Sequence, residues 1–259
     1  FTELTEQYVA ELGLVAAREL GVTKVLIGRD TRESGKQLET ALANGLLAGG
    51  VSVELLGVAP TPAIAFLAAK RGCASAAITA SHNPYLDNGV KLFANGGVKL
   101  SDAQQDAIES HMTGSATVPA ASALQVDLLG EYASHIVGLF PVLAFANIRV
   151  VLDCANGAMS DVAPEVFARL GATVIVLNDR PNGKNINEGC GATHPEVVSE
   201  AVRLHKADLG LAFDGDGDRV IAVDHIGDVV DGDHLIALAA IDLHKRGKLK
   251  SNSVAVTVM

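Results

Sequence analysis

Apolar residues recur along the chain in two spacings, and this pattern predicts an alternation of helices and short strands. Leu4, Tyr8 and Leu12 begin a helical spacing that extends over residues 5–20, and Gly21 suits the C-terminal end of that helix. Short runs rich in Val, Ile and Leu follow, each too brief for a helix and bounded by glycine or polar residues. The pattern therefore predicts an α/β protein.

A strand–helix–strand pattern occurs twice in the sequence, in the segments VLIGRD…GLLAGGVSVELL and RVVLDC…FARLGATVIVL. Two such steps more than a hundred residues apart predict two similar domains, each a mixed, mostly parallel sheet flanked by helices. The predicted strands are residues 24–28, 51–56, 148–153 and 172–177, with helices ending near residue 48 and spanning residues 163–170.

Three helix starts carry a capping-box pattern, in which a Ser or Thr is followed three residues later by Gln or Glu. The pairs are Ser34 with Gln37, Ser101 with Gln104, and Thr193 with Glu196. A small-residue loop over residues 113–122 and a helix near residues 126–139 then lead to Pro141. We expect a first domain at residues 1–146, a second at 147–250, and the start of a further unit at 251–259.

The segment AFDGDGDRV carries the densest chemistry in the chain, because Asp214, Asp216 and Asp218 alternate with two glycines after the strand LGLAF. Three close carboxylates repel one another unless a cation compensates them, and the glycines let the backbone fold around one hard cation. This spacing predicts a metal loop at the C-terminal end of a strand, where open α/β sheets bind ligands.

Two other classes of protein carry similar aspartates. An EF-hand requires a glycine at the sixth position of the loop and a glutamate at the twelfth, where this chain has Arg219 and His225. A haloacid-dehalogenase phosphatase also ends a strand in DxD, but usually continues with threonine or valine where this chain has Gly217 and Asp218. The phosphatase alternative is weakened and stays open.

The segment TASHNPYLDNGVK follows a buried strand that ends at residue 78 and places Ser81 in a turn with His82 and Asn83. An exposed serine there suits a nucleophile or a phosphorylated residue, although an ordinary Ser/Asn turn has the same composition. Lys91 lies on the next short strand, where its charge could face the serine across a hairpin. Arg29, in GRDTRESG, is a candidate phosphate ligand before a helix start.

The formal charge of −10 and eight aspartates against one arginine over residues 208–233 argue against nucleic acid as a partner. The chain has no apolar run long enough for a membrane span and no secretory signal, so we expect no membrane partner. Its three cysteines have no metal-ligand spacing and suit a reduced, cytoplasmic setting.

Taken in order, the motifs resemble the α-D-phosphohexomutase family over essentially the whole chain. They are TASHNP, NGVK, IGRDTRESG, LDCANGA, NINEGCGATHPE and FDGDGDRVIAVDHIGDVVDGD. The resemblance implies an isomerase that interconverts two phosphosugars through a phosphoserine and a sugar 1,6-bisphosphate. CGATHPE and the aspartate of DNGVK favour the branch that converts glucosamine 6-phosphate into glucosamine 1-phosphate for cell-wall precursors, over the mannose and glucose phosphate branches.

The resemblance also assigns roles to particular residues. It implies that Ser81 is the phosphorylated serine and that Mg²⁺ binds Asp214, Asp216, Asp218 and a phosphoserine oxygen. Arg219 would contact the phosphoryl group, Lys91 would transfer a proton, and Arg29, His82 and Asn83 would bind phosphate or substrate. Glucosamine 1,6-bisphosphate, or a similar bisphosphate, would serve as intermediate, and the resemblance allows a homodimer.

The family has four domains, and this chain matches the first two, without the sugar-recognition and phosphate-binding loops of the others. We expect these 259 residues alone to bind Mg²⁺ but to turn over substrate poorly or not at all, since positioning supplies much of phosphoryl-transfer catalysis. A non-catalytic Mg²⁺-binding fragment is the alternative that the residues leave open.

Overall fold

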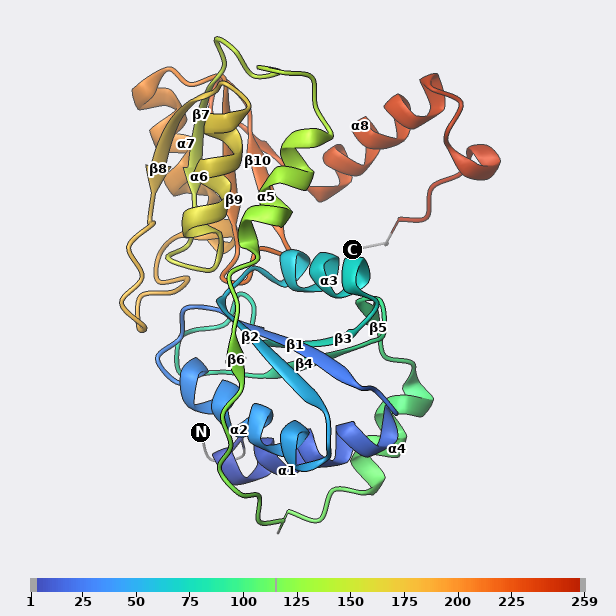
Figure 1. The fold of residues 1–259 in the computed structure, drawn as a ribbon. Helices are drawn as coiled ribbons and strands as arrows, with labels where there is room; N and C mark the ends of the chain where they lie inside the picture. Colours follow the sequence, from blue (N-terminus) through green and yellow to red (C-terminus); the bar gives the residue numbers. More distant parts are fainter. Residues whose placement is uncertain (1–3, 115, 257–259) are drawn as a thin grey trace.

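Two α/β domains follow one another in a computed structural model that describes residues 4–114 and 116–256 (Figure 1). In the first, helices cover both faces of a six-stranded sheet. Its elements are α1 (Glu6–Glu19), β1 (Lys24–Arg29), α2 (Gly35–Ala48), β2 (Ser52–Val58), α3 (Thr61–Arg71), β3 (Ala74–Ile78), β4 (Val90–Ala94), β5 (Val98–Lys99), α4 (Asp102–Ser110) and β6 (Leu124–Gln125).

The second domain contains a five-stranded sheet that lies above the first in Figure 1. Helix α5 (Leu129–Gly138) leads into it, and α8 (Gly232–Lys245) follows it. The remaining elements are β7 (Arg149–Asp153), α6 (Met159–Arg169), β8 (Thr173–Leu177), η1 (Gly191–Thr193), α7 (Pro195–His205), β9 (Leu209–Phe213), β10 (Val220–Val223), β11 (Val229–Val230) and η2 (Lys250–Asn252).

The predicted duplication is confirmed by the strand order. The first sheet runs β5-β4-β3-β1-β2-β6 and the second runs β11-β10-β9-β7-β8, so five strands repeat in the same order. In each sheet three adjacent strands are parallel, β3-β1-β2 in the first and β9-β7-β8 in the second, and the strand beside β3 or β9 is antiparallel. The β3–β4 connection of the first domain is therefore equivalent to the β9–β10 connection of the second.

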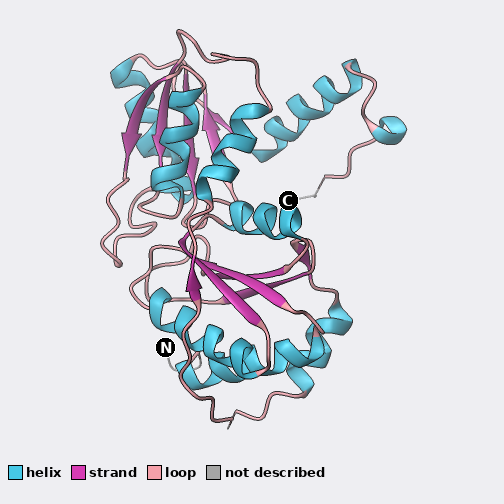
Figure 2. Cartoon of the chain, in the orientation of Figure 1, coloured by secondary structure: helices cyan, strands magenta, loops and turns pink. Residues whose placement is uncertain are grey.

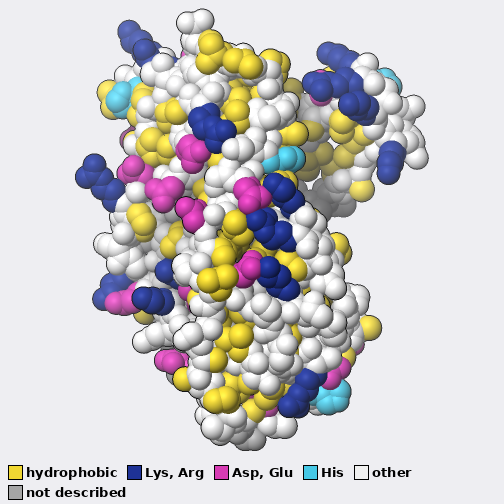
Figure 3. Space-filling model, viewed as in Figure 1, with side chains coloured by type: hydrophobic (Ala, Val, Ile, Leu, Met, Phe, Trp, Pro, Cys, Tyr) yellow, Lys and Arg dark blue, Asp and Glu magenta, His cyan; other side chains and the backbone are white. Residues whose placement is uncertain are grey.

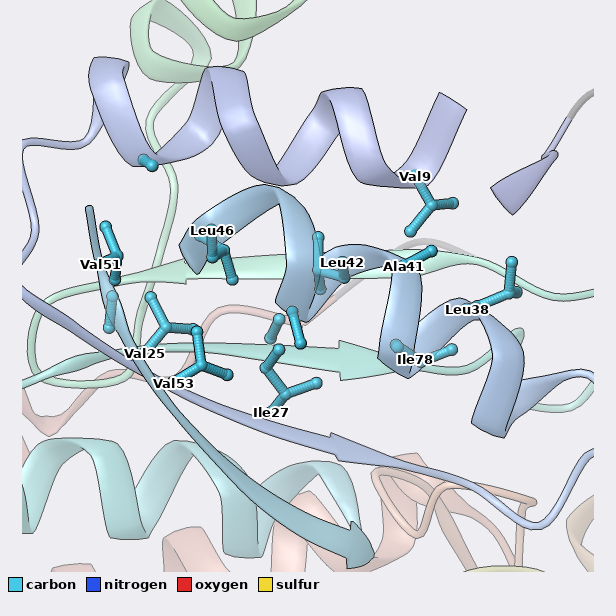
Figure 4. Packing of buried hydrophobic residues seen from close by; sticks show 14 of the residues in the cluster. Val9, Val25, Ile27, Leu38, Ala41, Leu42, Leu46, Val51, Val53 and Ile78 are labelled. Atoms are coloured by element: carbon cyan, nitrogen blue, oxygen red, sulfur yellow. The ribbon is translucent and has the colours of Figure 1, made fainter. Parts of the chain in front are cut away.

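Alternation along β1 decides which side chains enter the core of the first domain. Val25 and Ile27 point to the face covered by α1 and α2, where they pack with Leu38, Leu42 and Leu46 (Figure 4). Leu26, which lies between them, points to the opposite face of the sheet and packs against α3. By the same alternation the side chain of Arg29 is directed towards α2, which matters for the site below.

Only one of the three predicted capping boxes forms. Ser101 and Gln104 make both reciprocal hydrogen bonds at the start of α4. The prediction for Ser34 is wrong, because its hydroxyl accepts a hydrogen bond from Asn88 Nδ2 at 2.9 Å instead of capping α2. The third prediction is also wrong, because Thr193 lies in η1 and α7 begins after His194.

Helix α5 connects the two domains. Ala133 is buried against Val162 and Val166 of α6, while Glu131 forms ion pairs with Lys70 and Arg71 at the end of α3. The helix thus packs on the second domain and is held by charge to the first. The predicted boundary near residue 146 lies after this helix and stays a prediction.

The ion pairs of Glu131 predict a pH-dependent contribution to stability. Hydrogen bonds from Arg71, then from Lys70, lower the pKa of this carboxyl from 4.5 to about 2. The stabilisation is therefore complete above about pH 4.5 and is lost as the pH falls towards 2. Because the pair is partly solvated, we expect Glu131→Gln to reduce the free energy of unfolding by only about 0.5–1 kcal/mol at pH 7.

Urea unfolding of both proteins between pH 3 and 7 measures this difference. Glu165→Gln, which removes the exposed ion pair with Arg169 within α6, is the control for a surface pair that leaves the domain connection intact. A difference between wild type and Glu131→Gln that does not shrink at low pH would contradict the assignment.

Helix α8 extends away from the second sheet, and none of its side chains is buried (Figure 2). In the described part of the chain, no helix has both the length and the apolar character needed to cross a bilayer. The face shown in Figure 3 mixes basic and acidic side chains on the two domains.

Candidate phosphoryl-transfer and metal site

Ser81 and the aspartate triplet meet where the two equivalent hairpin connections face each other. Ser81 follows β3 with φ 54°, and its backbone N–H donates to Thr79 Oγ1 at 2.8 Å. Its hydroxyl is buried and donates to Asp214 Oδ2 at 2.6 Å, across the interface between the domains. The structure thus brings together the two motifs that stand 133 residues apart.

The three carboxylates lie as the sequence predicts, at the C-terminal end of β9. One oxygen from each of Asp214, Asp216 and Asp218 lies within 4.8 Å of the others. Gly217 has φ 69°, a left-handed conformation that glycine adopts without a steric penalty, and it turns the loop so that the carboxylates converge. Strands flank this loop, so the helices of an EF-hand are absent here.

Asp216 is buried and accepts two side-chain hydrogen bonds. Its Oδ2 accepts hydrogen bonds from Thr61 Oγ1 at 2.6 Å and from Lys91 Nζ at 2.7 Å. Its Oδ1 is buried and has no hydrogen-bond partner among the described residues. A buried carboxylate oxygen without a partner is costly, and a cation coordinated by this oxygen would remove that cost.

Electrostatics also favour a cation at the triplet. Burial raises the pKa of Asp214 to about 6, the hydrogen bond from Ser81 opposes this shift, and the neighbouring charges of Asp216 and Asp218 add to it. Hard divalent cations such as Mg²⁺ prefer carboxylate and phosphate oxygens. The donor set therefore fits Mg²⁺, and the hydroxyl of Ser81 lies beside it.

Lys91 supplies the local counter-charge. It lies on β4, and its ammonium contacts Asp216 Oδ2 at 2.7 Å and Asp218 Oδ2 at 2.9 Å. Burial lowers the pKa of this lysine, but the hydrogen bonds and charges of the two aspartates outweigh burial and raise it. Lys91 is thus held as a cation against the triplet, and its role in proton transfer stays a prediction.

Arg219 closes the metal loop and leaves its guanidinium accessible. Its backbone N–H donates to Asp214 Oδ1 at 3.1 Å, which fixes the loop. The side chain is 59% exposed, with Nε 3.9 Å from Asp218 Oδ1. It can therefore reach an anionic ligand at the mouth of the site.

The other predicted binding residues are placed differently. Arg29 Nε pairs with Glu39 of α2 at 3.4 Å and Nη1 donates to the backbone of Asp30, so its polar contacts are with α2 and its own loop. His82 is exposed and lines a cavity of about 470 Å³ between the Ser81 loop and residues 184–194. Asn83 Nδ2 donates to Asp87 Oδ2 at 3.1 Å. Their binding roles stay predictions.

Sequence reasoning did not predict the supporting roles of three residues that shape the site. Thr61, at the start of α3, fixes Asp216 through its hydroxyl and through a backbone hydrogen bond of 2.9 Å. Arg32 and Asn187 donate to the backbone of the Ser81 loop from opposite domains. Arg32 and Asn187 lie in two of the motifs named above, GRDTRESG and NINEGCGATHPE. The spacing of residues within a motif does not show which of its side chains contacts the Ser81 loop.

The chain thus repeats one α/β domain, with a serine loop in the first copy and three carboxylates that could hold a metal ion in the second. Residues 1–118 match the first α/β/α domain of the phosphoglucomutase/phosphomannomutase family, and residues 130–227 match its second. The chain belongs to this family, and the family prediction is confirmed. The haloacid-dehalogenase alternative is thereby excluded.

Curated relatives carry a more specific name. The chain is 46% identical to a phosphoglucosamine mutase of Desulforudis audaxviator, over 99% of this chain and 60% of that protein. It is 48% identical to one of Alkalilimnicola ehrlichii, over 99% of this chain and 59% of that protein. The chain thus spans about 60% of the length of these relatives.

Solved structures agree on the fold. A phosphoglucomutase/phosphomannomutase family protein of Burkholderia thailandensis, 29% identical, superposes with a TM-score of 0.80 over 94% of this chain and 56% of that chain. A putative phosphomannomutase of Thermus thermophilus has a TM-score of 0.85 over 95% of this chain and 59% of that chain. At 23% identity the second shows the fold alone.

Proposed function

We propose that this sequence provides the phosphoserine and metal loops of a phosphoglucosamine mutase, which interconverts glucosamine 6-phosphate and glucosamine 1-phosphate. The observation that carries the proposal is the 2.6 Å hydrogen bond from Ser81 Oγ to Asp214 Oδ2, where the serine loop meets the metal loop. The curated relatives named phosphoglucosamine mutase, at 44–48% identity, support the choice of sugar.

The phosphoryl group of phosphorylated Ser81 moves to the 1-hydroxyl oxygen of glucosamine 6-phosphate as its bond to Ser81 Oγ breaks. The hydroxyl proton passes to the protein, and the product is glucosamine 1,6-bisphosphate. After the bisphosphate reorients in the site, its 6-phosphoryl group returns to Ser81 Oγ as the bond to the 6-oxygen breaks. Ser81 loses its hydroxyl proton, the 6-oxygen of the sugar takes one up, and glucosamine 1-phosphate leaves. In each step the phosphoryl group moves between the serine oxygen and a sugar hydroxyl oxygen.

Asp214, Asp216 and Asp218 would hold Mg²⁺, which neutralises charge on the phosphoryl oxygens when bound. Lys91 is held as a cation by two of these carboxylates and would donate a proton to the oxygen that the phosphoryl group leaves. The exposed guanidinium of Arg219 can bind the phosphoryl group through paired hydrogen bonds. Arg29, His82 and Asn83 remain candidates for binding phosphate or sugar.

We also propose a cytoplasmic location, which the three free and buried cysteines support. A homodimer remains an expectation from the resemblance. The mannose and glucose phosphate reactions are alternatives, because the matching family is described by those two activities.

Two measurements test the proposal. Incubation with glucosamine 1,6-bisphosphate followed by intact-mass analysis should show one added phosphate, located on Ser81 by peptide mapping. A coupled assay on the protein at its natural length should show faster formation of glucosamine 1-phosphate than of mannose or glucose 1-phosphate. A preference for mannose or glucose would select the alternative substrates, and absence of both phosphate and turnover would leave a Mg²⁺-binding module.

A further inference from the structure

The guanidinium of Arg32 is buried and uses every N–H donor it has. Nε donates to Asp30 Oδ2 at 2.9 Å, and the four donors of Nη1 and Nη2 all reach backbone carbonyls of the Ser81 loop. These acceptors are Ser81 O at 3.1 Å, Asn83 O at 2.8 Å, Asp87 O at 2.9 Å, and Pro84 O. One side chain thus fixes the backbone of the whole turn.

This arrangement depends on the shape of arginine as well as on its charge. Asp30 is also buried and accepts both the backbone N–H and Nε of Arg32, so the buried charge is compensated. A lysine ammonium offers three donors on one atom and cannot reach all four carbonyls that Nη1 and Nη2 hold. Lysine would keep the charge and lose most of these hydrogen bonds.

Asn187 of the second domain holds the same carbonyls from the other side. Its Nδ2 donates to Ser81 O at 2.9 Å and to Asn83 O at 3.1 Å, while its own backbone N–H is fixed by Ala155 O at 2.9 Å. The Ser81 and Asn83 carbonyls each accept one hydrogen bond from Arg32 and one from Asn187. These two shared carbonyls are where the two domains jointly set the conformation of the turn.

Gly215 of the metal loop completes the contact. A Cβ at this position would lie 2.7 Å from Ser81 O and 2.9 Å from Asn187 Nδ2. Only a glycine therefore lets the metal loop approach the serine backbone this closely. The Ser81 turn is enclosed by Arg32, Asn187 and Gly215, while its hydroxyl faces Asp214.

We propose that Arg32 and Asn187 are positioning residues for phosphoryl transfer, which hold Ser81 in its left-handed conformation with its oxygen directed at the metal loop. The proposal rests on the function proposed above for Ser81. Because Asn187 comes from the second domain, the serine is fully positioned only when the two domains are docked. Neither residue contacts the reacting atoms, and each acts through the backbone of the turn.

The test uses Asn187→Asp and Arg32→Lys, with Asn185→Asp as the matched control. Asn187→Asp keeps the side-chain size but places a carboxylate oxygen against two carbonyl oxygens. Asn185 lies in the same segment, and its Nδ2 donates to Arg180 O, away from the serine turn. In the protein at its natural length we expect kcat to fall about 100-fold in both test variants and less than threefold in the control.

Four further readouts separate positioning from a general loss of structure. KM for the phosphosugar should change less than threefold, and Mn²⁺ binding by the unphosphorylated 259-residue chain should stay within threefold of wild type. Amide hydrogen exchange over residues 80–88 should accelerate in Asn187→Asp, while exchange in β1 and β9 stays unchanged. The double variant should lose less than the product of the two single losses, because both residues hold the same carbonyls.

The outcomes distinguish this proposal from the proposed function. If Ser81→Ala removes turnover while both test variants keep kcat within threefold of wild type, the positioning proposal is wrong and the function stands. If Ser81→Ala keeps turnover, the phosphoserine function itself fails. A fall of kcat accompanied by equal losses of metal binding and of β-strand protection also contradicts positioning, because it shows a general loss of structure.

Discussion

Turnover by the Ser81→Ala variant is expected to fall by roughly 10⁴-fold or more, the scale that accompanies loss of a catalytic nucleophile. The substitution removes the oxygen that would carry the phosphoryl group. It leaves the carbonyl of residue 81 in place, so Arg32 and Asn187 can still hold the turn. The loss should therefore appear in kcat and in phosphate incorporation, with the fold preserved.

The measurement is the coupled assay for glucosamine 1-phosphate on the protein at its natural length, together with intact-mass analysis after incubation with the bisphosphate. Ser110→Ala serves as the control, because its hydroxyl only donates to Ala107 O at the exposed end of α4. Turnover within tenfold of wild type in Ser81→Ala would mean that this serine is an ordinary turn residue.

The duplicated fold could be predicted from the sequence because the strand, helix, strand pattern is local. Alternation and helical spacing are set by residues within a few positions, and both copies keep them. The metal loop was predictable for a similar reason, since Asp214, Asp216 and Asp218 are close along the chain and repel one another without a cation. Their contact with Ser81 followed from the resemblance.

The supporting residues could not be predicted because their partners are distant in sequence. Arg29 and Arg32 lie in one basic loop at the end of β1, but their side chains have different partners. Arg29 pairs with Glu39 of α2, and Arg32 donates to the backbone of the Ser81 turn. The sequence around Ser34 has the capping-box pattern, but in the fold its hydroxyl accepts a hydrogen bond from Asn88, which lies 54 residues further along the chain. Asn187 reaches Ser81 across 106 residues.

Removing one carboxylate from the triplet is expected to abolish most of the stabilisation by divalent cations. In Asp216→Asn, affinity for Mg²⁺ or Mn²⁺ should fall roughly 10- to 100-fold or more, because a charged oxygen ligand is replaced by a weak amide oxygen. Thr61 can still donate to the amide oxygen, so the loop keeps one of its fixing contacts. The change therefore acts on metal binding more than on the fold.

Calorimetric titration of the 259-residue chain with Mg²⁺, and thermal unfolding with and without the ion, measure this effect. Saturating Mg²⁺ should raise the Tm of wild type by more than that of Asp216→Asn, since an ion that binds only the folded state stabilises it by mass action. Asp233→Asn, an equal charge change at the exposed start of α8, should respond like wild type.

The comparison without metal decides what the buried oxygen does. Asp216 Oδ1 has no partner among the described residues, and burial raises the pKa of its neighbour Asp214 to about 6. Replacing Asp216 removes like-charge repulsion but also the ion pair with Lys91, so the Tm in chelator should change by only a few degrees. Equal Mg²⁺-induced shifts in wild type and variant would instead identify the triplet as a structural acidic turn, with Lys91 and Arg219 as counter-charges.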